Sequence, residues 1–213
     1  MMAAVLAGCA GLPDIAAGGF GLSGRAVERA VLAGGEVVVA GPPGFCVDRS
    51  TVRDDETGAF ALLGSCASIS NSARAPAPAV PAVLTVSVSP RSGSAISAAI
   101  DGLKPYFTSQ AGRAALARDG RAASVEVLDT RREGGAFYIR LRDTSGAHGE
   151  LQQVYWRGLF DVNGRIVTIS VTGFADRPIP SQAGLALLET FAARIRSESR
   201  NAGQTGGEAN KEA

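Results

Sequence analysis

The most constraining feature of the sequence is a pair of strand-like segments, Val154–Val162 and Arg165–Val171, separated only by Asn163-Gly164. Asn-Gly adopts the positive φ angles of a type I′ turn, the commonest tight connection between antiparallel strands. Two strands joined by two residues have to pair antiparallel, because a parallel pair needs a crossover of a dozen residues or more. The sequence therefore predicts a β-hairpin here and an antiparallel sheet around it.

Other segments add strands and a few helices. A second hairpin is expected over Ser124–Thr130 and Ala136–Arg142, which flank an Arg-Arg-Glu-Gly-Gly turn. Further strands are expected at 36–40, 45–49, 59–63 and 82–89, and helices at 25–33, 94–103, 109–118 and 181–196. The last helix is amphipathic, with Leu185, Leu188, Phe191 and Ile195 on one face. Hairpins interspersed with a few helices indicate an α+β fold with an antiparallel sheet.

The chain of 213 residues is long enough for one domain with a substantial core. Residues 1–24 are expected to be a truncated signal segment followed by a glycine-rich tether, and 25–200 a single α+β domain. Residues 201–213 are polar and low in complexity, so a disordered tail is expected there.

Cys9 follows Leu6-Ala7-Gly8, and this tetrapeptide matches the bacterial lipobox, in which the cysteine thiol receives diacylglycerol. A signal peptide should also carry a basic region and an apolar region of about 7 to 15 residues, and neither is complete before Cys9. A start codon assigned too far downstream would explain the shortened segment. The alternative is a chance cysteine in a sequence rich in alanine and glycine.

Cys46 and Cys66 are each flanked by apolar residues and are separated by nineteen others. One interpretation is a disulfide, which would indicate an oxidising compartment such as the periplasm. The other is a pair of buried free thiols, a common state for cysteine. The disulfide and the lipobox indicate the same compartment and so support each other.

The order of the later elements resembles that of the PsbP/DcrB-like domains. The resemblance rests on the hairpin VYWRGLFDVNGRIVTISV followed by the amphipathic segment GLALLETFAARIRS, and it covers roughly 36–200. That group includes small bacterial envelope lipoproteins, and the resemblance implies a strongly bent antiparallel sheet packed between helices. It implies no shared chemistry that could be assigned to particular residues.

Catalytic and metal-binding patterns are weak. The single histidine, His148, lies in a loop segment and has no GxSxG nucleophile motif beside it. Gly19–Gly24 forms a formal GxGxxG without the strand and the acidic residue that a dinucleotide site needs, so it is interpreted as linker. The run Asp54-Asp55-Glu56 lacks the spacing of a calcium loop. No catalytic residue, metal or cofactor is predicted.

Strand alternation provides one candidate binding surface. If the polar faces of the predicted strands coincide, they form a surface of two tyrosines and three arginines: Tyr138, Arg140, Arg142, Tyr155 and Arg157. Guanidinium groups bind carboxylate or phosphate, so this surface would suit an anionic ligand. The alternative is a solvated face, or one covered by a helix with the arginine stems packed along it.

These observations together favour a non-catalytic envelope lipoprotein that faces the periplasm from the inner or the outer membrane. It would be attached through Cys9 and would bind an envelope protein or a small anionic ligand. The net charge of +1 gives no reason to expect a nucleic-acid partner. The alternatives are a periplasmic enzyme of hydrolase type with an unidentified site, and a secreted binding domain without lipid.

Overall fold

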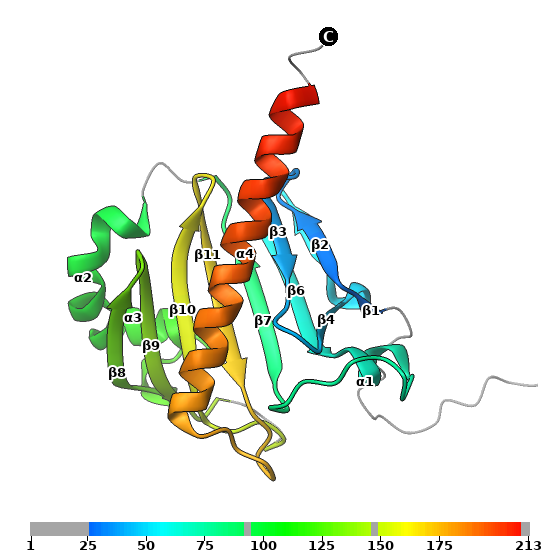
Figure 1. The fold of residues 1–213 in the computed structure, drawn as a ribbon. Helices are drawn as coiled ribbons and strands as arrows, with labels where there is room; N and C mark the ends of the chain where they lie inside the picture. Colours follow the sequence, from blue (N-terminus) through cyan, green and yellow to red (C-terminus); the bar gives the residue numbers. More distant parts are fainter. Residues whose placement is uncertain (1–25, 92–94, 146–148, 210–213) are drawn as a thin grey trace, which may run out of the picture.

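The computed structural model describes residues 26–91, 95–145 and 149–209 of the chain, and the centre of the fold is one large antiparallel sheet (Figure 1). Its spatial order is β1-β4-β6-β7-β11-β10-β9-β8, and β5 also pairs with β6. The strands are β1 Ala26–Val27, β4 Phe45–Asp48, β5 Arg53–Asp55, β6 Gly58–Ser65, β7 Val83–Val88, β8 Val125–Glu133, β9 Ala136–Asp143, β10 Val154–Val162 and β11 Arg165–Thr172. A separate two-stranded sheet contains β2 Arg29–Leu32 and β3 Val37–Ala40.

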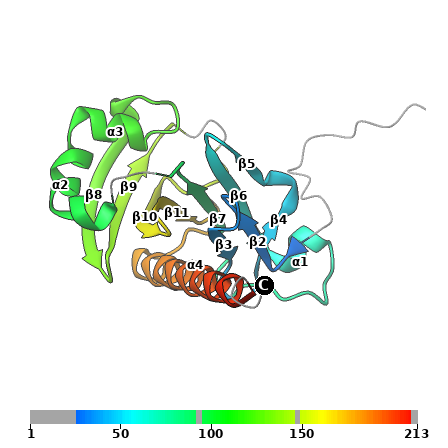
Figure 2. The same ribbon diagram turned by 90° about the horizontal axis from the view of Figure 1, so that it is seen from above.

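Four α-helices accompany the sheets: α1 Cys66–Ser70, α2 Ile96–Thr108, α3 Gln110–Leu116 and α4 Ser181–Ala209. Helix α4 and the β2–β3 pair cover one side of the large sheet, and α2 and α3 cover the other side at β8, β9 and β10 (Figure 2). The α+β class, the antiparallel sheet built from hairpins and the C-terminal helix are all confirmed.

The two sides of the sheet bury separate cores. The larger core lies between the sheet, α4 and β3, and its most buried large side chains include Phe160, Phe191 and Leu188. The smaller core lies under α2 and α3 and contains Phe137 and Tyr155. Strands β9 and β10 are covered on both sides, so most of their side chains are buried at odd-numbered and at even-numbered positions.

The predicted hairpins at the end of the sheet are confirmed. Asn163 and Gly164 both have positive φ, 49° and 77°, as a type I′ turn requires. Gly134 and Gly135 also have positive φ, so the β8–β9 turn is the Gly-Gly pair and the strands extend closer to it than predicted. Ser109 caps the start of α3, because its hydroxyl accepts the Gly112 N–H at 3.1 Å.

The predicted helix over 25–33 is wrong. This segment forms β1 and β2, and β2 turns through Ala33, Gly34 and Gly35 into β3. All three turn residues have positive φ, and the Gly35 N–H donates to the Leu32 carbonyl at 3.2 Å. Pairing with β3, in which every residue is buried, determines the conformation of this segment.

Helix α4 is longer than the sequence predicted. It was expected to end near residue 196, but it continues to Ala209 and includes residues 201–209 of the expected disordered tail. Ser199 explains part of the extension, because its hydroxyl accepts the Val38 N–H of β3 at 2.9 Å and is buried. The helix is thereby held against the β2–β3 sheet beyond its apolar stripe.

Cys46 in β4 and Cys66 at the start of α1 form the predicted disulfide, with an S–S distance of 2.00 Å. Both cysteines are buried, and Ile69 packs against them. Cys9, the 19–24 glycine motif and His148 lie outside the described residues. Among the residues that the structure describes, no helix is both long and apolar enough to cross a membrane.

Candidate functional site

A cavity of about 620 Å³ opens at the edge of the sheet where β9 ends and β10 begins. This volume lies in the range that holds a small organic molecule. Its walls come from the loop before β10, the loop between β11 and α4, and the first turn of α4. The lining residues are Arg118, Arg140, Asp143, Gly149–Tyr155, Trp156, Val171, Ala175, Pro178–Ser181 and Gly184.

Gln152 joins the two loops that form the walls. Its side-chain carbonyl accepts the Ile179 N–H at 2.6 Å, and its amide donates to the Val154 carbonyl. The backbones also pair, since the Gln152 N–H donates to the Gly173 carbonyl at 2.9 Å. These bonds make the cavity wall a continuation of the β10–β11 hairpin, so the wall is part of the rigid scaffold.

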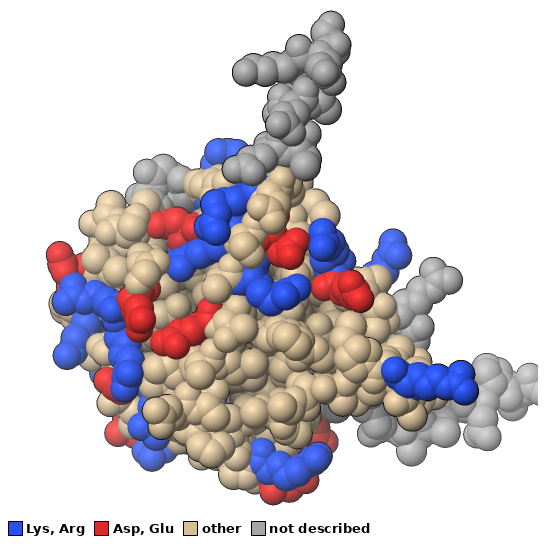
Figure 3. All heavy atoms as spheres, in the orientation of Figure 1, with Lys and Arg blue, Asp and Glu red and all other residues tan. Residues whose placement is uncertain are grey.

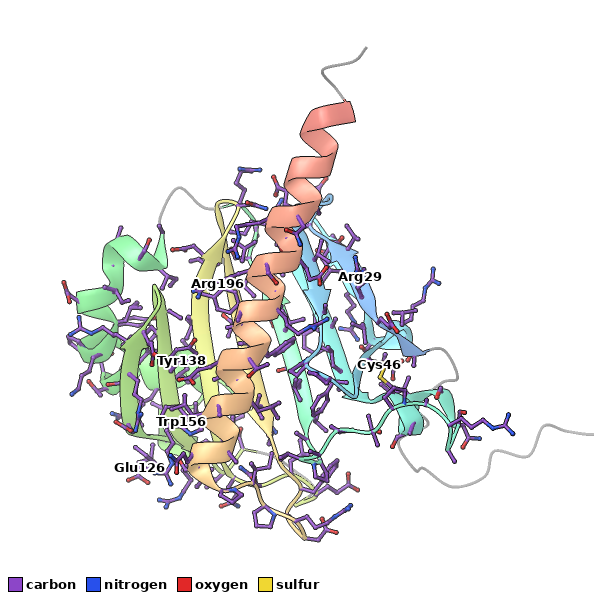
Figure 4. All side chains as sticks on the ribbon, viewed as in Figure 1. Arg29, Cys46, Glu126, Tyr138, Trp156 and Arg196 are labelled. Carbon is purple, nitrogen blue, oxygen red and sulfur yellow. A yellow bond between two sulfur atoms is a disulfide. The ribbon has the colours of Figure 1, made fainter. Side chains whose placement is uncertain are left out.

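Trp156 lines the cavity, and its side chain lies beside the first part of α4 (Figure 4). Its indole N–H donates to the Ser181 carbonyl at 2.9 Å and to the Ser181 hydroxyl at 3.1 Å. It is the only tryptophan of the chain, and it is 3% exposed. The first turn of α4 is therefore fixed above the indole, and its positive dipole end lies at the cavity.

Asp143 is the centre of a buried polar network on the opposite side of the sheet from Trp156. Its side chain is 1% exposed and accepts hydrogen bonds from the Ser145 N–H at 2.9 Å and from the Tyr155 hydroxyl at 3.3 Å. Arg118 lies 3.7 Å from its second oxygen. Through these contacts Asp143 ties the β9–β10 loop to the sheet.

Tyr155 and Arg157 extend this network away from the cavity. Arg157 donates to the Leu116 carbonyl at 3.0 Å and to the Tyr155 hydroxyl at 3.2 Å. Burial raises the pKa of the Tyr155 phenol above its ordinary value, and the charges of Arg157 and Arg118 oppose that rise. The Tyr155 hydroxyl is thus a neutral bridge between Asp143 and Arg157, with both sides occupied.

Arg140 is the exceptional cation of the cavity. Its Nε atom is buried without a hydrogen-bond partner, and in the part of the chain that the structure describes it is the only buried side-chain nitrogen or oxygen in that state. Its cross-strand neighbours are Trp156 in β10 and Asp129 in β8. Asp129 pairs instead with Arg131, at 3.7 Å. A buried donor without a hydrogen bond destabilises the folded state by about 1–3 kcal/mol. Arg140 at the cavity wall therefore carries a donor that the protein itself leaves unsatisfied.

The charges of the lining balance except at Arg140. Arg118 is paired with Asp143, and the remaining carboxylate, Glu150, is exposed at the rim. Exposed charges are screened by solvent, whereas a half-buried one acts at a lower effective dielectric. Among the described residues that line the inside of the cavity, only Arg140 therefore carries a charge without an opposite partner.

The five residues predicted to form one anion-binding surface do not form it. Even-numbered positions of β9 pair with even-numbered positions of β10, as Arg140 does with Trp156, so Tyr155 and Arg157 point to the opposite side of the sheet from Tyr138 and Arg140. The polar faces of the two strands do not coincide. Of the five, only Arg140 and Tyr155 line the cavity.

The other predicted residues have structural contacts. Tyr138 is buried in the core under α4, where burial raises the pKa of its phenol (Figure 4). Arg142 forms an exposed ion pair with Glu126. No sequence pattern indicated Gln152, Trp156 or the 173–180 loop as parts of a site, because their proximity depends on how three distant segments meet.

The acidic run at 54–56 is used in turns. Asp54 accepts the Ala33 N–H at 2.9 Å, and Asp55 accepts the Thr57 N–H at 2.8 Å. The hydrogen bonds from Thr57 lower the pKa of Asp55. Among the described residues, no three histidine, cysteine or acidic side chains are grouped closely enough to hold a metal ion. On the face shown in Figure 3, basic and acidic side chains are intermixed and form no field of one sign.

Gly173 provides a test of the cavity wall. A Cβ atom at this position would lie 2.4 Å from Gln152 Oε1 and 2.7 Å from Ile179 Cγ1, so Gly173→Ala should force the two loops apart. We expect a loss of about 1–3 kcal/mol in the free energy of unfolding, measured by urea titration. The matched control is Gly102→Ala in α2, where nothing lies within 4 Å and the substitution should stabilise by about 0.5–1 kcal/mol. Equal effects of the two substitutions would contradict the tight wall.

Comparison with known proteins yields no match for this chain among protein-family models, curated proteins or solved structures. The resemblance to the PsbP/DcrB-like domains therefore stays a prediction. The function has to be argued from the cavity and the disulfide.

Proposed function

We propose that this protein is a non-catalytic binding domain of the bacterial cell envelope that takes a small anionic ligand into the cavity beside Trp156. The observation that carries the proposal is Arg140, a half-buried cation without a partner in a cavity of about 620 Å³. In this proposal Asp143 has a structural role, because its carboxylate accepts hydrogen bonds from Ser145 and Tyr155. Binding is the activity that this arrangement supports best.

The envelope location is supported by the disulfide between Cys46 and Cys66, because structural disulfides persist in oxidising compartments and are rare in the cytosol. The lipobox-like sequence at Cys9 supports attachment to a membrane through diacylglycerol. Mass spectrometry of the cell-derived protein tests this attachment. A diacylglyceryl group on an N-terminal Cys9 is expected, and an unmodified Met1 or Ala3 would exclude the anchor.

The binding activity is tested by thermal unfolding of the wild type and Arg140→Gln with a panel of simple anions: phosphate, sulfate, acetate and octanoate. A ligand that binds only the folded state at 100 times its Kd stabilises it by about 2.7 kcal/mol. We expect at least one anion to raise the Tm of the wild type more than that of Arg140→Gln. If no anion distinguishes the two proteins, the proposed function is wrong.

A further inference from the structure

We infer that the ligand of this cavity is a monocarboxylate with a compact apolar body, whose carboxylate pairs with Arg140. This inference rests on the proposed function and specifies its ligand. It depends on three properties of the cavity: the number of uncompensated charges, the geometry of the free donor and the chemistry of the remaining wall.

The charge count selects a monoanion. Arg118 is paired with Asp143 at 3.7 Å, so Arg140 is the one unpaired cation among the described lining residues, and Glu150 adds a negative charge at the rim. A phosphate monoester carries close to two negative charges at neutral pH. Its second charge would have no cation to meet and would be repelled by Asp143 and Glu150. A carboxylate matches the single charge of Arg140.

The donor geometry also suits a carboxylate. A guanidinium presents its N–H groups as a planar fork that matches the two oxygens of a carboxylate, and Nε belongs to one edge of that fork. Arg140 lines the cavity, so its guanidinium can meet a carboxylate there. Its Nε atom is buried without a partner, and it gains a hydrogen bond if the side chain turns toward the ligand. The first turn of α4, fixed over Trp156 by Ser181, adds a favourable dipole to the same region.

The remaining wall contains both polar and apolar side chains. The side chains of Trp156, Val154, Val171 and Ile179, together with two prolines of the 173–180 loop, line the cavity beside Arg140. Burying apolar surface gives about 25 cal/mol per Å². A bare anion such as acetate would leave this wall in contact with water, whereas an apolar body attached to the carboxylate would cover it. The wall therefore favours a ligand that has both a carboxylate and an apolar body.

The experiment uses Trp156 as the reporter, because it is the only tryptophan and lies at the cavity. The wild type is titrated with octanoate, octanol, acetate and inorganic phosphate, followed by tryptophan fluorescence and in parallel by calorimetry. We expect octanoate to bind saturably, at least ~10-fold more tightly than octanol or acetate, since a hydrogen bond to a charged group contributes about 1.5–3 kcal/mol. Phosphate should bind more weakly than octanoate.

Two substitutions locate the binding. Arg140→Gln should weaken the binding of octanoate at least ~10-fold and leave the binding of octanol unchanged. The matched control, Arg132→Gln, removes an exposed arginine of β8 that is paired with Asp101 outside the cavity, and it should leave every titration unchanged. Arg140→Met is a second variant. Arg140 has no hydrogen bond to lose, so this variant should fold with an undiminished Tm and show the same loss of octanoate binding.

The outcomes separate the two proposals. If phosphate binds more tightly than octanoate and loses affinity in Arg140→Gln, the proposed function stands and the carboxylate inference is overturned. Equal binding of octanol and octanoate also overturns the inference. If no anion depends on Arg140, both proposals fall.

Discussion

Replacing Phe191 of α4 with alanine should reduce the free energy of unfolding by about 3–5 kcal/mol, the largest loss expected from a single substitution in this protein. Phe191 is fully buried in the core that α4 forms with the large sheet and with β3. Truncation removes a large apolar side chain and leaves a void that the surrounding strands can close only in part. Urea unfolding followed by far-UV circular dichroism measures the loss.

The matched control is Tyr106→Ala in α2, which also truncates an aromatic side chain but at a site that is 47% exposed. We expect it to cost less than about 1 kcal/mol, because surface substitutions have small effects. If Phe191→Ala cost no more than this control, α4 would not be packed on the sheet. Since the first turn of α4 also lines the cavity, Phe191→Ala should weaken the binding of any ligand there.

The second half of the sheet could be predicted from the sequence because its signals are local. Asn163-Gly164 specifies its turn, and the alternation of the flanking segments specifies two strands of matching length. The helix predicted at 25–33 failed for a related reason. A glycine such as Gly34 is typical of the end of a helix. Here Gly34 and Gly35 lie in the turn of the β2–β3 hairpin, and every residue of β3 is buried.

The candidate site could be predicted only in part. Alternation correctly placed Trp156 and Tyr155 on opposite faces of β10, but it does not say which face of β9 each one meets. That depends on register, and here the register places Arg140 beside Trp156. The cavity further requires the 149–153 and 173–180 segments to meet through Gln152. No periodicity within either segment encodes this contact.

Removing the disulfide should have the second-largest effect. Cys46→Ser combined with Cys66→Ser should lower the free energy of unfolding by about 3 kcal/mol, because the bridge closes a loop with a sequence separation of 20 residues and restricts the unfolded chain. Urea unfolding of the oxidised wild type and the double variant measures the difference. Dithiothreitol provides the control, since it should destabilise the wild type by the same amount and leave the double variant unchanged.

This loss bears directly on where the protein can function. A domain has a total stability of about 5–15 kcal/mol, so about 3 kcal/mol is a large share of it. Cys46 and Cys66 are both buried, so an exported protein should keep the bridge, and denatured, unreduced protein from cells should show neither thiol reactive. Reactive thiols at both positions, with stability unaffected by dithiothreitol, would remove the support that the disulfide gives to an envelope location. The cavity and Arg140 would then have to be explained in a reducing compartment, because their geometry does not depend on the bridge.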